Sequence, residues 1–204
     1  MKKSDHYKTI AKPAPETLFK DKGSKFYGYA FKVTTEDEVK DKLEELWQNH
    51  NKASHICYAW QLGKRYEHYR ANDDGEPSNS AGMPIYGQLQ SFDVTQVLVA
   101  VVRYYGGTNL GVGGLINAYR TSAQMTLEGA QIVNRTIKTE LELKFGYDLM
   151  NNVMRVIKEK NLVIKDQDMH LDCKIILAIR ETDLNQIKER FDAIFGVKTK
   201  VLKD

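Results

Sequence analysis

The chain of 204 residues lacks most of the features that would assign it to a specialised class of protein. Its two cysteines, Cys57 and Cys173, show neither a disulfide framework nor zinc-ligand spacing, and the five histidines are scattered. No run approaches the roughly 20 apolar residues of a membrane span. Residues 1–19 lack the apolar stretch of a secretory signal. We therefore expect a cytoplasmic protein with reduced core cysteines, no metal and no membrane contact.

Strong charge is also missing, since the formal net charge is only +3. The lysines are unevenly distributed: residues 1–32 carry eight lysines and three acids, a local balance of +5. A basic N-terminal segment could face phosphate groups. A solvated lysine-rich surface is the favoured interpretation.

The most unusual stretch that is present is RYYGGTNLGVGGL, residues 103–115, which follows the apolar run 97–102 and precedes a helical pattern. Its glycines are Gly106, Gly107, Gly111, Gly113 and Gly114. A buried strand, a glycine-rich loop and a helix N-terminus in succession leave backbone N–H groups free, which favours an anion site. Neither a Walker A loop nor a G-x-G-x-x-G pattern fits the stretch. A structural loop that turns tightly against another segment is the other interpretation.

The first part of the chain predicts alternating strands and helices. Strands are expected at 24–33, 54–62, 65–70 and 95–103, the second and third joined as a tight hairpin through Gly63 and Lys64. Helices are expected after Thr35, from Ser78 or Ser80 to Gln90, and from about Leu115 to Gly129. The first helix has one apolar face, made of Val39, Leu43, Leu46, Trp47 and His50.

From Ile132 the pattern predicts a second, smaller unit. Strands at 136–146, 161–166, 171–180 and 197–202 and helices at 148–160 and 183–195 follow the ferredoxin-like plan. The fold class is therefore α+β with two domains, residues 1–134 and 135–204. Strand 171–180 has no aromatic side chain, and Phe145 and Tyr147 lie only near the end of its partner. We do not expect bases to stack on this domain.

The segment NDDGEPS, residues 72–78, interrupts all regular structure and contains the acidic cluster Asp73, Asp74 and Glu76. Three carboxylates could hold Mg²⁺ or act as acid and base. Asp-Gly and Glu-Pro are also turn formers, and Asp side chains satisfy loop amides, so a structural or recognition role is the favoured interpretation. We expect this acidic loop to lie beside the glycine loop as one site. Arg103 would then either hold a phosphate or be paired with Asp73 or Asp74.

His55 and Cys57 alternate on a strand and should point to the same face. A Cys–His nucleophile pair is conceivable. A core cysteine near a hydrogen-bonded histidine is the favoured interpretation.

Four blocks of the sequence resemble the IMPACT family, whose bacterial branch is often called YigZ. They are KGSKF (22–26), SHICYAWQLG (54–63), NDDGEPSNSAGMPIYGQL (72–89) and VLVAVVRYYGGTNLGVGGLINAYRTSA (97–123). The resemblance implies an N-terminal domain with the fold of a ribosomal-protein second domain. It also implies a ferredoxin-like C-terminal domain similar to the last domain of elongation factor G.

Two departures from the family pattern are Asn79-Ser80, where Gly-Thr is common, and Asn117, where Arg is common. Ser80 keeps the hydroxyl group. The loss of an arginine beside the glycine loop removes one anion contact.

The resemblance implies a non-enzymatic protein that binds RNA or the ribosome and regulates translation, without a cofactor. The expected phosphate contacts are the glycine loop with Lys22, Lys25, Arg103 and Arg120, and the acidic loop contributes Asp73, Asp74, Glu76 and Ser80. The alternative is an enzyme that acts on a small phosphorylated or peptide-like substrate, with the acidic loop and the glycine loop forming its site.

Overall fold

A computed structural model describes residues 5–170 and 172–202. Contacts divide the chain into two compact units, Tyr7–Arg135 and a second unit that contains the residues from Thr136 onward together with Asp5 and His6. Asp5 belongs to the second unit because its carboxylate accepts hydrogen bonds from Arg180 and Thr182. The boundary between two independent domains at residues 134 and 135 stays a prediction.

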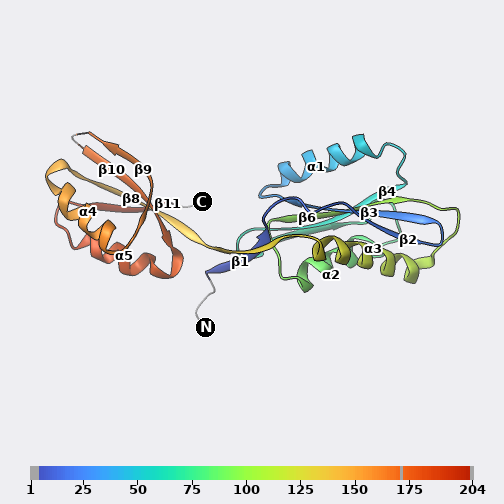
Figure 1. Ribbon diagram of the computed structural model, residues 1–204. Helices are drawn as coiled ribbons and strands as arrows, with labels where there is room; N and C mark the ends of the chain where they lie inside the picture. The colour runs from blue at the N-terminus through green and yellow to red at the C-terminus, as the bar shows by residue number, and fades with distance from the viewer. Residues whose placement is uncertain (1–4, 171, 203–204) are drawn as a thin grey trace. The chain divides into compact units, whose positions relative to one another are not determined.

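The unit Tyr7–Arg135 is built on an antiparallel five-stranded sheet of order β2-β3-β6-β4-β5. Its strands are β2 (Thr17–Asp21), β3 (Ser24–Lys32), β4 (His55–Leu62), β5 (His68–Asn72) and β6 (Val97–Tyr104). Helices α2 (Gly82–Ser91) and α3 (Gly111–Glu128) cover one face, and α1 (Glu36–Asn49) lies on the other (Figure 1). β6 is central because its apolar run is buried on both faces.

The helix predicted after Thr35 is present, and the Thr35 hydroxyl accepts a hydrogen bond from the Glu38 N–H as an N-cap. Val39 and Leu46 are buried, as predicted, whereas Trp47 is 41% exposed, so its inward placement was wrong. The hairpin prediction also needs correction, because Leu62 pairs with His68 and leaves residues 63–67 as a longer loop. Tyr66, at φ +61°, lies inside that loop.

The second unit has an antiparallel sheet of order β11-β8-β10-β9. Its elements are β8 (Lys138–Gly146), α4 (Met150–Glu159), β9 (Val163–Met169), β10 (Asp172–Arg180), α5 (Leu184–Asp192) and β11 (Lys198–Leu202), with 3₁₀ turns at Tyr147–Leu149 and Glu181–Asp183. This is the order of the predicted ferredoxin-like plan. Val153 of α4 and Ile187 and Phe191 of α5 are buried in its core.

Two short strands, β1 (His6–Ile10) and β7 (Ile132–Thr136), pair as a separate two-stranded sheet. Neither strand was predicted from the sequence. Within the described ranges, no helix combines the length and the apolar character needed to cross a membrane.

Candidate functional site

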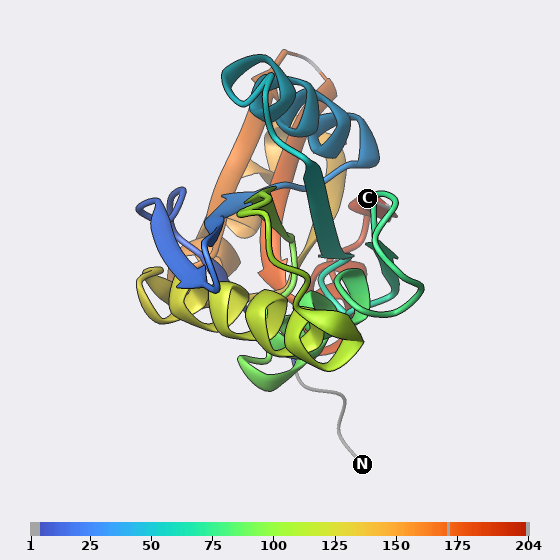
Figure 2. The same cartoon turned by 90° about the vertical axis from the view of Figure 1, so that its right-hand side faces the viewer.

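Arg103 and Tyr104 are the last two residues of β6. Their side chains point to opposite faces of the five-stranded sheet, since neighbouring residues of a strand alternate between its faces. Arg103 is paired with Phe26, on the face covered by α2 and α3. Tyr104 is paired with Lys25, on the face of α1. Figure 2, which looks at this end of the sheet, shows α1 and α3 on its two sides. The end of β6 therefore contributes to two different environments.

On the α3 face, Glu76 joins the acidic loop to β6 and α3. Its carboxylate oxygen Oε1 lies 2.5 Å from Arg103 Nη1 and accepts a hydrogen bond of 2.8 Å from the Tyr119 hydroxyl. His55 Nε2 lies 4.0 Å from the same oxygen. The side chains of Arg103 and Glu76 are only 6% and 5% exposed. The predicted acidic partner of Arg103 was Asp73 or Asp74, and the partner in the structure is Glu76.

Asp73 and Asp74 hold the acidic loop in shape. Asp73 accepts hydrogen bonds from the N–H groups of Asn79, Ala81 and Gly82. Asp74 Oδ2 accepts one from the Ile56 N–H at 2.7 Å. These bonds use the carboxylates to satisfy backbone donors, as Asp does in many turns.

Ser80 is fully buried and donates its hydroxyl to the Pro77 carbonyl at 2.6 Å. In the described part of the chain, no group of three or more His, Cys, Asp or Glu side chains is arranged to hold a metal ion. The hydrogen bonds of Asp73, Asp74 and Ser80 therefore hold the acidic loop in one conformation, and the carboxylate of Glu76 points toward the protein interior.

The guanidinium of Arg103 is enclosed between two aromatic rings, those of Phe26 and Tyr105, each 5.5 Å from its central carbon. Its Nε is buried and has no hydrogen-bond partner among the described residues. Freeing the guanidinium for an external anion would break a buried ion pair, which typically costs about 3–5 kcal/mol. A phosphate contact by Arg103 stays a prediction that requires this pair to open.

His55 and Cys57 bind the main chain of the acidic loop. His55 Nδ1 lies 2.7 Å from the Asp74 carbonyl, and the Cys57 thiol donates to the Asp73 carbonyl at 3.0 Å. Cys57 is fully buried, and burial raises the pKa of its thiol well above the usual range. The favoured prediction of a core cysteine and a hydrogen-bonded histidine is confirmed.

The glycine loop starts against the turn between β2 and β3. The Gly106 N–H donates to the Ser24 hydroxyl at 3.2 Å, and a Cβ on Gly106 would collide with the backbone of Gly23 and Ser24. Gly107 and Gly111 have φ of +86° and +70°, a conformation that favours glycine. A Cβ on Gly114 would lie 3.0 Å from that of Leu110, whereas Gly113 faces open space.

The predicted lysines and Arg120 lie at the surface. Lys22 is in the β2–β3 turn and Lys25 is near the start of β3, next to the glycine loop. Arg120 is an exposed residue of α3. That Asp74 and Gly111 lie close together as parts of one site stays a prediction. The acidic loop contacts β6 and α3 through the side chain of Glu76.

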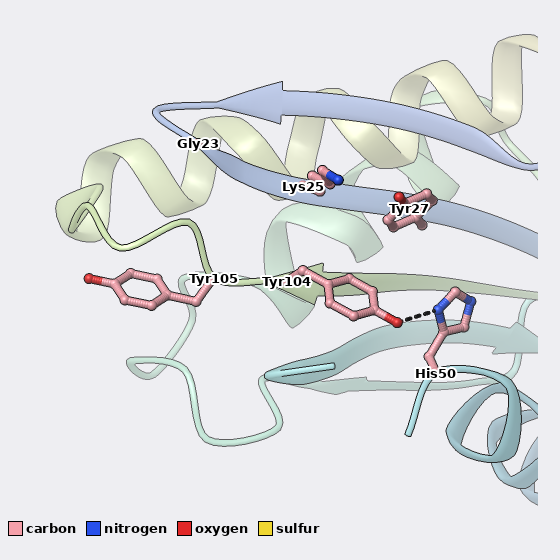
Figure 3. A pocket seen from close by; sticks show the side chains of 6 residues that line it. All are labelled: Gly23, Lys25, Tyr27, His50, Tyr104 and Tyr105. Atoms are coloured by element: carbon pink, nitrogen blue, oxygen red, sulfur yellow. Dashed lines mark hydrogen bonds between the residues drawn. The ribbon is translucent and has the colours of Figure 1, made fainter. Parts of the chain in front are cut away.

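On the α1 face, a pocket of about 410 Å³ opens beside the glycine loop (Figure 3). It is lined by Gly23, Lys25, Tyr27, His50, Tyr104 and Tyr105. Figure 3 shows Lys25 and Tyr27 along β3 and Tyr104 pointing toward His50, whose Nδ1 lies 2.9 Å from the tyrosine hydroxyl. Of these lining residues, only Lys25 was predicted to bind a ligand. The alternation of aromatic residues in 24–33 and the Tyr104–Tyr105 pair were the available signals.

Comparison with known proteins places this geometry in context. Residues 22–127 match the family model described as Impact N-terminal domain. The chain is 28% identical to IMPACT family member YvyE of Bacillus subtilis (strain 168) over 166 residues, which is 81% of this chain and 76% of that protein. It is 32% identical to IMPACT family member YigZ of Escherichia coli (strain K12) over 143 residues, or 69% of this chain and 70% of that one.

Among solved structures, one described as the crystal structure of a hypothetical protein is similar over 98% of both chains, with a TM-score of 0.71 and 24% sequence identity. This likeness extends the shared fold over both units.

Proposed function

The chain belongs to the IMPACT family, with YigZ among its relatives, and on that basis we propose that it is a non-enzymatic protein of the cytoplasm that binds RNA, free or on the ribosome, and regulates translation. We further propose that its units correspond to a ribosomal-protein second domain and to the last domain of elongation factor G. Both proposals rest on the resemblance of its motifs.

The observation that carries the RNA proposal is the basic edge, which we define as Lys22, Lys25, the loop residues 106–110 and the first turn of α3, residues 111–114. Both lysines are exposed, and neither is ion-paired within the described part of the chain. Helix α3 starts at Gly111 without a side-chain cap. The N–H groups of its first turn, which like those of any helix lack an intrahelical acceptor, therefore have no capping side chain either and, with the helix dipole, favour a negatively charged group.

Binding is favoured over catalysis because the acidic residues are already engaged. Asp73 and Asp74 accept hydrogen bonds from backbone N–H groups, and Glu76 is paired with Arg103. A metal-dependent or acid–base mechanism would have to give up contacts that hold the loop together. The lysines of the basic edge make no such contacts.

Salt dependence of RNA binding tests this proposal, because phosphate contacts release counterions. We expect the double variant Lys22→Ala/Lys25→Ala to bind a short unstructured RNA more weakly at low salt. Its plot of log affinity against log salt should be flatter by about 0.7 per lysine. The matched control is Lys12→Ala/Lys32→Ala, which removes two exposed lysines of the same unit, Lys32 at the other end of β3.

The control should keep the wild-type slope. Equal slopes for both double variants, with both proteins folded, would contradict the basic edge as the phosphate-binding surface. Absence of RNA binding by the wild type itself would contradict the function.

A further inference from the structure

We propose that the pocket on the α1 face takes an unpaired RNA base, so that the RNA recognised by this protein is single-stranded at the basic edge. This inference rests on the proposed function and specifies its ligand. It is carried by the lining of the pocket, by the rigidity of its aromatic wall and by the position of Lys25.

The pocket exists because α1 leaves part of the sheet uncovered. The principal contact of α1 is with β4. Along β3, the side chains on this face are those of Lys25, Tyr27, Tyr29 and Phe31, none of them buried. Tyr104, at the end of β6, is likewise partly exposed. Several aromatic side chains therefore stay partly exposed on this sheet face while they pack against its buried cluster.

These rings form a fixed wall. The centroids of Tyr27 and Tyr104 are 5.8 Å apart in an edge-to-face arrangement, and the ring of His50 lies 5.8 Å from that of Tyr27 and 5.9 Å from that of Tyr104. Such pairs prefer tilted and edge-to-face geometry because of the ring quadrupole. A base that enters would meet rings that are already positioned, so little side-chain ordering opposes binding.

A chain of hydrogen bonds sets the direction of the hydroxyl groups. The Tyr29 hydroxyl donates a hydrogen bond of 2.5 Å to the Glu16 carboxylate. Burial and, to a smaller extent, this carboxylate raise the pKa of Tyr29, so the hydroxyl keeps its proton. Its oxygen lies 2.7 Å from His50 Nε2 and therefore accepts from that nitrogen. In neutral His50, Nδ1 is then the acceptor of the Tyr104 hydroxyl. Tyr104, which lines the pocket, is thereby held in one orientation.

The lining suits a nucleotide. Tyrosine rings offer faces for stacking, which is how proteins hold single-stranded nucleic acid without reading its sequence. Lys25 supplies the positive charge for the attached phosphate, and among the described residues that line the pocket there is no carboxylate to repel it. A volume of about 410 Å³ lies within the range of ligand sites, about 300–1,000 Å³. A base inside a duplex could not enter, whereas an unpaired base can be splayed out.

The test compares a short single-stranded RNA, the same sequence inside a hairpin duplex, and a mononucleotide, by fluorescence anisotropy or competition. We expect the single strand to bind best and the mononucleotide to compete only weakly. Tyr104→Leu should weaken single-strand binding by roughly 5- to 150-fold, because one base loses its stacking partner. Tyr104→Phe, which keeps the ring, should retain most of the affinity.

The matched control is Tyr147→Leu, which removes a tyrosine that is 65% exposed and lies outside the pocket. Tyr27→Leu serves as a second pocket variant if Tyr104→Leu does not fold. The loss caused by either pocket variant should be the same at low and high salt, whereas the loss caused by Lys25→Ala should shrink as salt rises.

Equal binding of single strand and duplex, with no effect of Tyr104→Leu or Tyr27→Leu, would overturn the base pocket and leave the proposed RNA binding intact. Tight binding of the mononucleotide alone would overturn it in favour of a free nucleotide. Failure of the wild type to bind any of the RNAs would overturn the proposed function itself.

Discussion

Glu76 and Arg103, 27 residues apart in the sequence, form a buried ion pair of 2.5 Å that fastens the acidic loop to the end of β6. Tyr119 donates to the same carboxylate oxygen, so a third element is tied to the pair. Removal of one partner would leave the other charge buried and unpaired, which is the costly situation in a protein interior.

We therefore expect Glu76→Gln and Arg103→Met each to lower the free energy of unfolding by about 3–5 kcal/mol. The double variant should lose less than the sum, because it leaves no orphaned charge. Urea unfolding followed by tryptophan fluorescence checks this, since both tryptophans, Trp47 and Trp60, lie in the unit Tyr7–Arg135.

The control for this cycle is Lys40→Ala, which removes an exposed ion pair with Asp37 and should change stability by no more than a few tenths of a kcal/mol. Strictly additive losses for Glu76→Gln and Arg103→Met would mean that the pair is not coupled.

The glycines of the basic edge should differ in their sensitivity to alanine. Gly106→Ala would press a Cβ against the backbone of Gly23 and Ser24, which cannot move aside as a flexible side chain can. We expect a clear loss of stability and a displaced β2–β3 turn.

Gly113→Ala is the matched control, because nothing lies within 4 Å of the added Cβ and the residue is in α3. Alanine in a helix is favoured over glycine by up to about 1 kcal/mol, so this variant should be as stable as the wild type or more stable. Thermal melts of both variants measure this difference in stability. Equal destabilisation would show that the close approach at Gly106 does not distinguish the two positions.

Alkaline pH should destabilise the unit Tyr7–Arg135 through Cys57. Burial raises the pKa of this thiol above its value in the unfolded chain, about 8.5. Its contribution to stability is therefore complete below the unfolded pKa and is lost progressively as pH rises toward the folded pKa. Above about pH 8.5, the thiol should account for a fall of up to about 1.4 kcal/mol per pH unit.

Urea unfolding by tryptophan fluorescence between about pH 7 and 9.5 measures this slope. Cys57→Ala should flatten it. Cys173→Ala, which changes the buried cysteine of the other unit, should not. A Cys57→Ala protein with the wild-type slope would rule out the thiol as the source.

Two independent domains should unfold independently. Phe191 is fully buried in the cluster of the second unit, and Phe→Ala at such a site costs about 3–5 kcal/mol. We expect Phe191→Ala to shift one transition in circular dichroism and to leave the tryptophan-monitored transition unchanged. A matching shift in tryptophan fluorescence would contradict the two-domain prediction.

Sequence patterns were sufficient for elements with long, regular periods. The apolar run of β6, the capped helix α1 and the βαββαβ order of the second unit follow from local periodicity and capping. Trp47 was misplaced because α1 covers only part of the sheet, so a narrower stripe of its surface is buried. Strands β1 and β7 have five residues each and pair across most of the chain, which leaves little local signal.

The site was harder to predict because its contacts depend on the path of a loop. Three acids were available to Arg103, and backbone N–H groups engage Asp73 and Asp74, which leaves Glu76. The strand predicted at 24–33 is present as β3, and its sequence pattern alternates aromatic with small or polar residues. It could not reveal that α1 leaves this part of the face open, nor that His50 would bridge Tyr29 and Tyr104.

Crosslinking tests the central claim, that RNA binds at the basic edge and its pocket, most directly. The full chain bound to a photoreactive single-stranded RNA is irradiated, and the attached residues are identified by mass spectrometry. We predict crosslinks at Lys25, Tyr27, Tyr104 or Tyr105, which surround the pocket beside the glycine loop. Crosslinks confined to the outer surface of α1 or to residues 136–202 would contradict the account.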